Sequence, residues 1–159
     1  MDFFTAVPSP LGVLRLTSDG EALTGLYLQS QDFGTAAMIQ QDGLPLFEAV
    51  RDWLDGYFVG APGEITFPLS PVGTPFQRRV WELLLTIPYG KTTTYGSLAK
   101  KLGPKMSAQA VGQAVGKNPI AIIIPCHRVL GAKGQLSGYA GGLENKQRLL
   151  DHEGISYLK

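Results

Sequence analysis

The only cysteine of the chain lies in a short segment whose side chains could activate it as a nucleophile. Cys126 follows Pro125 and precedes His127 and Arg128, so two ionisable groups flank the thiol. The thiolate is the reactive form of cysteine, and basic neighbours lower the pKa of a thiol. A single buried cysteine is more often simply a small apolar side chain. The flanking groups favour the first reading, and we expect Cys126 to be a nucleophile with a lowered pKa.

The base that would take the thiol proton is harder to place. Successive side chains along a strand point to opposite faces, so His127 cannot simply lie against Cys126. Either the chain turns at Pro125, or a water molecule connects the two groups. The only other histidine, His152, is expected on the surface of the last helix. We therefore expect His127 to be the base.

The second half of the chain predicts mainly helices around this segment. An uninterrupted apolar run at 120–124 predicts a fully buried strand that delivers Cys126 at its end. Thr74 and Pro75 are a plausible cap and first residue of a helix that Pro88 stops. The other expected elements are a helix capped by Thr93 or Thr94 and ending at Leu102, a helix over 107–116, a turn-rich loop over 131–142 that wraps the site, and a last helix over 143–153.

The helix over 107–116 is nearly bare of large side chains. Val111 and Val115 give it a thin apolar seam, and most of its other residues are Ala, Gly or Ser. Such a helix suits either tight packing in a core or insertion into a nucleic-acid groove, and its composition does not decide between them. Together with the helix before it, joined by a turn around 103–106, it has the dimensions of a helix-turn-helix.

The first half predicts a small sheet and one helix. Apolar residues at helical spacing occur over 45–58, between Pro45 and Gly60. The segment 68–73 looks like a linker, so we expect an N-terminal lobe over 1–72 and a second domain over 73–159. The expected strands are Phe4–Val7, Val13–Leu16, Leu26–Leu28 and Ile65–Phe67.

Charge is divided unevenly at the same boundary. Residues 1–72 contain two basic and nine acidic residues, a net charge of −7, whereas residues 73–159 contain twelve basic and four acidic residues, a net charge of +8. A basic half is typical of a domain that faces a polyanion. The alternative is that the two halves attract each other.

Composition also indicates where the protein works and which groups it can bind. No apolar run is long enough to span a bilayer, and the N-terminus lacks the pattern of a signal peptide. One cysteine cannot form an internal disulfide and excludes a zinc site built from several cysteines. We expect a cytoplasmic protein with no membrane partner, no metal and no cofactor.

The segment from Pro125 to Val129, preceded by Asn118-Pro119, closely resembles the signature of the methylated-DNA–protein-cysteine methyltransferases, the O6-alkylguanine-DNA alkyltransferases. Further blocks of the second half match this family in the same order. They are Phe76 with Val80-Trp81, Ile87 to Gly90, Thr94-Tyr95 with Leu98-Ala99, Ala110 to Gly112, Gly138 to Gly142, Lys146, Leu149-Leu150 and Glu153-Gly154. The first 70 residues match only in general pattern.

The resemblance implies a DNA repair protein that acts once. It would flip O6-alkylguanine out of double-stranded DNA and move the alkyl group irreversibly to Cys126, and O4-alkylthymine is a second candidate substrate. His127, oriented by Glu153, would generate the thiolate through a water, and Asn118 would brace the turn before the active-site segment. The remaining site residues that the resemblance implies, for substrate and DNA, are Tyr95, Ser107, Ala108, Gln109, Ala110, Arg128, Val129, Tyr139 and Ala140.

The resemblance also assigns the bare helix to the minor groove, where small side chains permit close approach. The family commonly carries an arginine that fills the gap left by the flipped nucleotide, and Gln109 occupies that position here, so weaker binding or slower flipping is expected. Ala140 stands where some relatives have serine. Exposed lysines are candidates for phosphate contacts or are simply solvated: Lys100, Lys101, Lys105 and Lys117.

The fold class that follows is α/β (α+β). A small ribonuclease H-like lobe, an antiparallel sheet with a helix, would precede a helical, winged-helix-like DNA-binding lobe that carries the active site. A monomer is expected in the absence of DNA. Two rival functions remain: a non-catalytic helix-turn-helix protein that binds alkylated DNA, against which the presence of Cys126 argues, and a cysteine hydrolase that turns over repeatedly.

Overall fold

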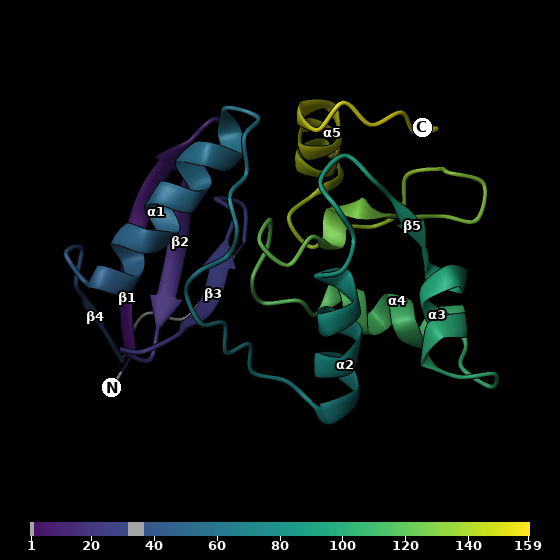
Figure 1. The fold of residues 1–159 in the computed structure, drawn as a ribbon, viewed down its shortest axis with the longest axis horizontal. Coiled ribbons are helices and arrows are strands. Elements are labelled where there is room, and N and C mark those ends of the chain that lie inside the picture. Colours follow the sequence, from purple (N-terminus) through teal and green to yellow (C-terminus); the bar gives the residue numbers. More distant parts are fainter. Residues whose placement is uncertain (1, 32–36) are drawn as a thin grey trace. The chain divides into compact units, whose positions relative to one another are not determined.

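The computed structural model describes residues 2–31 and 37–159. The chain forms two compact units, Met1–Val72 and Gly73–Lys159, and each is described by itself (Figure 1). No helix within the described ranges is both long and apolar enough to cross a bilayer.

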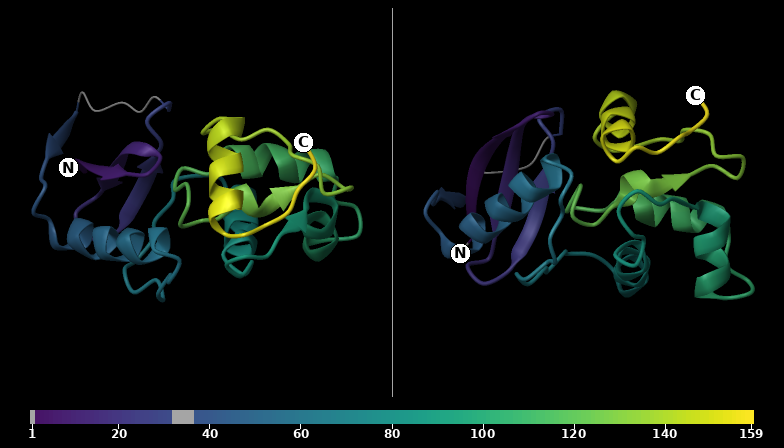
Figure 2. Two further views of the ribbon diagram at one scale, coloured as in Figure 1. Left: turned by 90° about the horizontal axis from the view of Figure 1, so that it is seen from above. Right: turned by 45° about the horizontal axis from the view of Figure 1, so that its top comes forward.

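The first unit is a sheet of four strands with one helix. Strands β1 (Asp2–Ser9), β2 (Gly12–Ser18) and β3 (Leu23–Tyr27) pair antiparallel, and β4 (Met38–Gln40) pairs parallel with β1, which gives the order β3-β2-β1-β4. Helix α1 (Pro45–Phe58) lies along one face of this sheet (Figures 1 and 2). Its buried residues are Leu46, Phe47, Val50, Leu54 and Tyr57.

Two features of the first unit differ from the sequence-based expectations. The predicted strand Ile65–Phe67 does not form, because the chain reaches the edge of the sheet only at Leu69, which bridges to Leu23. Pro68 and Ser70 bond to the backbone of Leu23 at 2.9 and 2.8 Å, so part of the predicted linker belongs to the sheet. Strand β4 was not predicted, since three residues are too few to show an alternating pattern.

The second unit contains four helices and a two-stranded sheet. Helix α2 (Pro75–Leu84) starts with the predicted cap, since the Thr74 hydroxyl accepts from the backbone of Gln77 and the Gln77 side chain accepts from the backbone of Thr74. Helix α3 (Tyr95–Leu102) is capped by Thr94, and α4 (Ala108–Gly116) by Ser107. The last helix, α5 (Leu143–His152), follows the loop over 131–142.

The helices α3 and α4 pack against each other, and α2 packs against α4. Val111, Ala114 and Val115 are the buried residues of α4, whereas Ser107, Ala108 and Gln109 at its start are exposed. The predicted core packing is therefore confirmed, and insertion into a groove stays a prediction. One face is packed in the core, and the other is free of bulk at the surface.

The apolar run at 120–124 is not a strand, which corrects the sequence-based prediction. All five residues are buried as expected, but Ile120 makes only an isolated bridge and residues 121–124 form turns and a bend before Pro125. Ile122 has φ 69°, and the backbone N–H of Ile123 donates to the carbonyl of Ala121 at 2.7 Å. That geometry is a strained γ-turn at a β-branched residue. An apolar run reports burial, and it does not distinguish a strand from buried turns.

Candidate active site and nucleic-acid interface

A tight turn places Cys126 at the start of a short helix. Pro125 has φ −82° and ψ 64°, and the N–H of Cys126 donates to the carbonyl of Ile124 at 2.8 Å, which is an inverse γ-turn. The 3-10 helix η1 (Cys126–Arg128) follows and leads into β6 (Val129–Leu130), which pairs parallel with β5 (Thr93–Thr94). The turn at Pro125, one of the two alternatives considered for His127, is observed.

Asn118 ties the end of α4 to this turn. Its side-chain amide donates to the carbonyl of Ile124 at 2.8 Å, and its amide oxygen accepts from the N–H of Ile120 at 3.0 Å. Both bonds are buried, so they hold the strained segment in one conformation.

The environment of Cys126 is less basic than the sequence suggests. Burial raises the pKa of the Cys126 thiol above its ordinary value, although hydrogen bonds from Asn118 and Tyr139 and the charge of Lys146 act in the opposite direction. The prediction of a lowered pKa is therefore wrong, because desolvation outweighs the neighbouring charge. At neutral pH the thiol is protonated, and it needs a base to become a nucleophile.

His127 lies in a buried cluster with Glu153 and Arg128. The His127 Nε2 atom lies 2.5 Å from Glu153 Oε2, and both side chains are fully buried. Arg128 donates from Nε to Glu153 Oε1 at 2.8 Å and from Nη1 to the carbonyl of Ile87 at 2.7 Å. The backbone N–H of Gly90 also donates to Glu153, at 2.9 Å. Glu153 therefore compensates the charge of Arg128 and orients the His127 ring.

The same contacts set two pKa values. Burial alone would raise the pKa of Glu153, but the hydrogen bond and charge of His127, with hydrogen bonds from Arg128 and the Gly90 backbone, outweigh it and lower this pKa to about 2. Burial lowers the pKa of His127, so the imidazole is neutral at neutral pH. Because the ionised Glu153 carboxylate accepts a hydrogen bond from the protonated Nε2 of His127, the lone pair of the neutral imidazole lies on Nδ1. Among the described residues, the buried Nδ1 atom has no hydrogen-bond partner.

The lowered pKa of Glu153 predicts an acid-sensitive contribution to stability. A carboxyl whose pKa falls from 4.5 to about 2 on folding stabilises the native state by about 3 kcal/mol above its ordinary pKa. This contribution should disappear as the pH falls from about 4.5 towards about 2. We expect the difference in unfolding free energy between the unmodified protein and Glu153→Gln, measured with urea, to shrink over that interval. A difference that stays constant with pH would contradict the assignment.

Lys146 is a member of the site to which the sequence analysis assigned no role, although it was named among the residues that match the family. Its side chain is fully buried, and its ammonium donates to the carbonyl of Val129 at 2.8 Å and to the hydroxyl of Ser137 at 3.0 Å. Burial lowers the pKa of Lys146 to about 8, which leaves it charged at neutral pH. Its spacing from Leu149 and Leu150, which face inward on α5, could have indicated its burial.

The structure places two of the remaining predicted pocket residues near Cys126. Tyr139 acts to lower the pKa of the Cys126 thiol, and the pKa of Tyr95 is raised by burial and by the charge of Cys126. Val129 is buried directly after η1, and Ala140 is exposed on the loop. Arg128, which the resemblance implied for substrate or DNA binding, is buried and paired with Glu153.

The ring of His152 packs edge-on against Tyr89, with the ring centroids 6.4 Å apart. Tyr89 in turn lies against Arg128, whose guanidinium carbon is 5.8 Å from the Tyr89 ring centroid.

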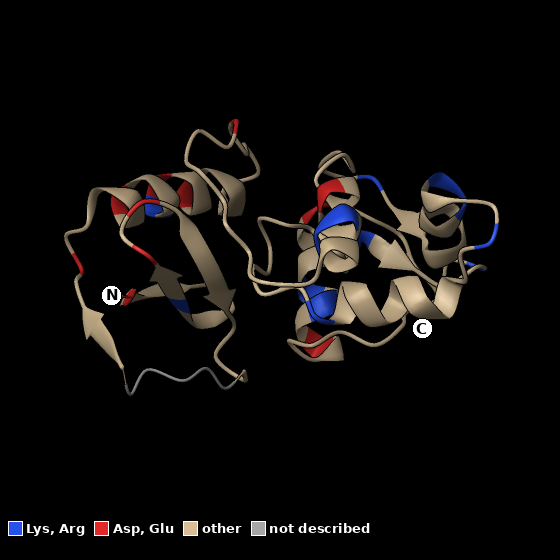
Figure 3. Cartoon of the chain, turned by 90° about the horizontal axis from the view of Figure 1, so that it is seen from below, with Lys and Arg blue, Asp and Glu red and all other residues tan. Residues whose placement is uncertain are grey.

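The outer surface of the second unit carries most of the positive charge of the chain. Figure 3 shows lysines and arginines mainly in this unit and acidic residues mainly in the first. All four lysines proposed for phosphate contacts are exposed: Lys100, Lys101, Lys105 and Lys117. Lys100, Lys101 and Lys105 precede the start of α4, and Lys117 lies at its other end. At the start of α4, Ser107, Ala108 and Gln109 are exposed and Ala110 is half-buried. This surface suits a polyanion that approaches α4 closely.

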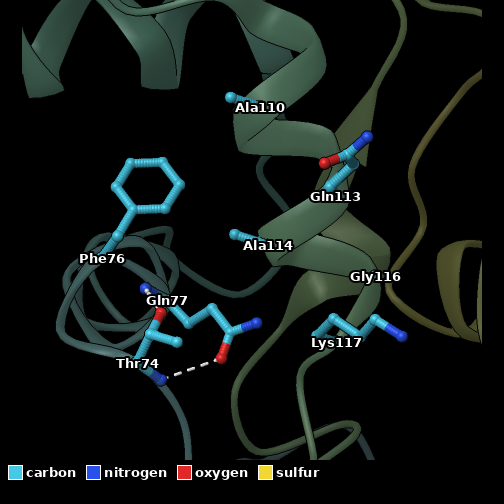
Figure 4. A pocket seen from close by; sticks show the side chains of 8 residues that line it. All are labelled: Thr74, Phe76, Gln77, Ala110, Gln113, Ala114, Gly116 and Lys117. Carbon is cyan, nitrogen blue, oxygen red and sulfur yellow. Dashed lines mark hydrogen bonds between the residues drawn. The ribbon is translucent and has the colours of Figure 1, made fainter.

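A groove of about 510 Å³ runs between the start of α2 and α4. Figure 4 shows Phe76 of α2 on the side of α4 that carries Ala110 and Ala114, whereas Gln113 points from the other side of the helix and Lys117 follows its end. The side chain of Gln77 is held by the backbone of Thr74 at 2.9 Å. Because Cys126 and the His127 cluster do not line this groove, it is not the place of the chemistry.

Known proteins resemble the chain over nearly its whole length. The models for the DNA-binding domain and the ribonuclease-like domain of 6-O-methylguanine DNA methyltransferase match residues 75–155 and 3–71. The methylated-DNA–protein-cysteine methyltransferase of Mycobacterium tuberculosis (strain H37Rv) is 44% identical over 153 residues, which cover 96% of this chain and 93% of that protein. The protein of the same name from Haemophilus influenzae is 43% identical over 158 residues, covering 98% and 88%.

Solved structures agree with these matches. The crystal structure of Mycobacterium tuberculosis OGT in complex with DNA has a TM-score of 0.88 at 44% identity, covering 95% of this chain and 92% of that one. The predicted fold class, a sheet-containing lobe followed by a helical DNA-binding lobe, is confirmed. Since the family's models match both units and relatives of more than 40% identity span almost the whole sequence, the chain belongs to the family of the methylated-DNA–protein-cysteine methyltransferases.

Proposed function

We propose that this protein repairs double-stranded DNA by moving the alkyl group from O6 of guanine to the sulfur of Cys126, once per molecule. Family membership supports transfer of an alkyl group from DNA to a protein cysteine. One observation carries the proposal for this site. The Cys126 thiol is buried near Asn118 and Tyr139, and the next residue, His127, is paired with Glu153.

The cluster supplies a route for the proton. The lone pair of His127 Nδ1 takes the thiol proton through one water, and the imidazolium is stabilised by ionised Glu153. The thiolate sulfur then attacks the alkyl carbon, forming a carbon–sulfur bond as the carbon–O6 bond breaks. The electrons of the broken bond stay on the guanine, which takes a proton from His127. Because a thioether does not hydrolyse, the protein is consumed.

The target carbon is inaccessible within the base stack, so the nucleotide must leave the duplex. We place the exposed start of α4 in the minor groove, where Ser107, Ala108 and Ala110 permit close approach and Gln109 occupies the space of the flipped nucleotide. Tyr95, Tyr139, Ala140 and the backbone of Val129 would line the pocket for the base. We expect the protein to be a monomer without DNA, and O4-alkylthymine is a second candidate substrate.

Gln109→Arg should accelerate repair of duplex substrate. Glutamine fills the gap and hydrogen-bonds, whereas arginine adds a positive charge among phosphates. The measurement is the single-turnover rate on duplex DNA and on the free alkylated base, which needs no flipping. An increase on duplex alone is expected, and equal rates on duplex before and after the substitution would exclude this role for residue 109.

Stoichiometry tests the function as a whole. Duplex DNA that carries radiolabelled O6-methylguanine is added in excess, and restored guanine is counted against protein. The proposal predicts that repair stops at one equivalent, with the label on the protein. Continued turnover with unlabelled protein would establish a hydrolase, and binding without conversion would establish a non-catalytic damage-binding protein.

A further inference from the structure

We propose that Ser137 is a positioning residue, through which the buried Lys146 ammonium orients the hydroxyl of Tyr95 to donate a hydrogen bond to one ring nitrogen of the extruded guanine. The inference rests on the proposed function and adds to it the recognition of the base. It assigns roles to Ser137 and Lys146 that the chemistry at Cys126 does not require.

The chain of contacts begins at a group that can only donate. The Lys146 ammonium has three hydrogens and no lone pair. Three acceptors surround it: the carbonyl of Val129 at 2.8 Å, the hydroxyl of Ser137 at 3.0 Å and the carbonyl of Ser137 at 3.3 Å. All of its hydrogens are therefore engaged, and the Ser137 hydroxyl oxygen must accept.

The second contact fixes the direction of the next one. The Ser137 and Tyr95 hydroxyl oxygens are 2.6 Å apart, and by geometry either could donate. Within the described part of the chain, the Ser137 hydroxyl contacts only Lys146 and Tyr95. If Tyr95 donated to it, the hydrogen of Ser137 would have no acceptor there. Donation from Ser137 to Tyr95 satisfies both groups, and it leaves the hydrogen of Tyr95 directed away from Ser137.

The free hydrogen lies where a substrate base must come. Tyr95 is half-buried; burial raises the pKa of its hydroxyl, and the charge of Cys126 raises it further, so the two groups lie in the same part of the site. A guanine whose alkyl carbon approaches the sulfur would therefore come near Tyr95. The candidate acceptors are N3, N7 and N1, since O6-alkylation removes the hydrogen from N1. A fixed donor favours a base with a ring nitrogen at that place and disfavours one with a C–H.

Ser137→Ala and Ser137→Thr test the relay by single-turnover methyl transfer. Ser137→Ala removes only the bridging hydroxyl, so Tyr95 is free to rotate its hydrogen, and a loss of about fivefold to tenfold in rate is expected from one neutral hydrogen bond. Ser137→Thr restores the hydroxyl and should recover most of the rate. Ser70→Ala, which alters an exposed residue of the first unit, is the matched control and should have no effect.

Substrate analogues separate this role from a structural one. Duplexes contain O6-methylguanine in which N1, N3 or N7 is replaced by CH, one at a time. The relay predicts that one of the three analogues slows methyl transfer by the unmodified protein. With that analogue, Ser137→Ala should cause no additional loss of rate. In a protein that already carries Tyr95→Phe, Ser137→Ala should likewise cause no additional loss. An equal penalty with all three analogues, or with Tyr95→Phe, would refute it. Methyl transfer by the unmodified protein in the same assay checks the proposed function separately.

Discussion

Cys126→Ser should abolish methyl transfer from O6-methylguanine and leave the fold and DNA binding unchanged. Serine has nearly the size of cysteine, so the buried turn at Pro125 accommodates it. A hydroxyl is far less acidic than a thiol, and the neutral His127 base cannot generate the alkoxide. The measurements are single-turnover transfer, affinity for duplex DNA and urea unfolding. Undiminished dealkylation by the variant would refute the role of the sulfur.

Glu153→Gln should cause the second-largest loss, and it should act on both stability and rate. The substitution keeps the volume but removes the charge that compensates Arg128 and orients His127. Leaving a buried charge without its partner costs about 3–5 kcal/mol. Loss of an oriented base slows transfer on the order of 100-fold or more. Urea unfolding at neutral pH and the transfer rate, measured where the variant is folded, are the two readouts.

The same helix provides a matched control for this substitution. Glu144 pairs with Arg148 at 3.0 Å on the exposed face of α5, where the glutamate side chain is 78% exposed. Glu144→Gln should change stability by less than about 1 kcal/mol and leave the rate unchanged. If Glu153→Gln behaved like Glu144→Gln, the buried cluster would have no role in the reaction.

Local signals in the sequence predicted most of the helices. The cap at Thr74 with Pro75, the cap at Thr94 and the apolar spacing over 45–58 each involve residues within one or two turns of one another. Such contacts are decided locally and can be recognised without knowledge of the fold. The three-residue strand β4 could not be recognised in this way, because it forms only by pairing with β1, which is distant in the sequence.

The errors around the site come from long-range contacts. The run at 120–124 is buried as predicted, but the turn at Ile122 depends on bonds from Asn118 and not on propensity. Arg128 was named only as a basic neighbour of the thiol and, from the resemblance, for substrate or DNA binding, whereas its ion pair with Glu153, 25 residues later, determines its place. The raised pKa of Cys126 follows from burial, which the basic character of the adjacent residues does not reveal.

These errors change the account of how the nucleophile is activated. The sequence suggested a sulfur that basic neighbours keep ionised. In the structure the thiol is neutral, and it becomes a nucleophile only when a base removes its proton. A neutral, buried thiol resists oxidation, which suits a protein that can react only once. Activation then depends on His127, whose Nδ1 is held ready by the bond between Nε2 and Glu153.

The most direct test of the account is to locate the transferred group. The protein is incubated with one equivalent of duplex DNA that carries isotope-labelled O6-methylguanine, digested, and analysed by mass spectrometry. The peptide that contains Cys126 should gain the mass of one CH₂ group together with the label, on the sulfur and in proportion to the guanine restored. Label on any other residue, or restored guanine with an unmodified Cys126 peptide, would contradict the central claim.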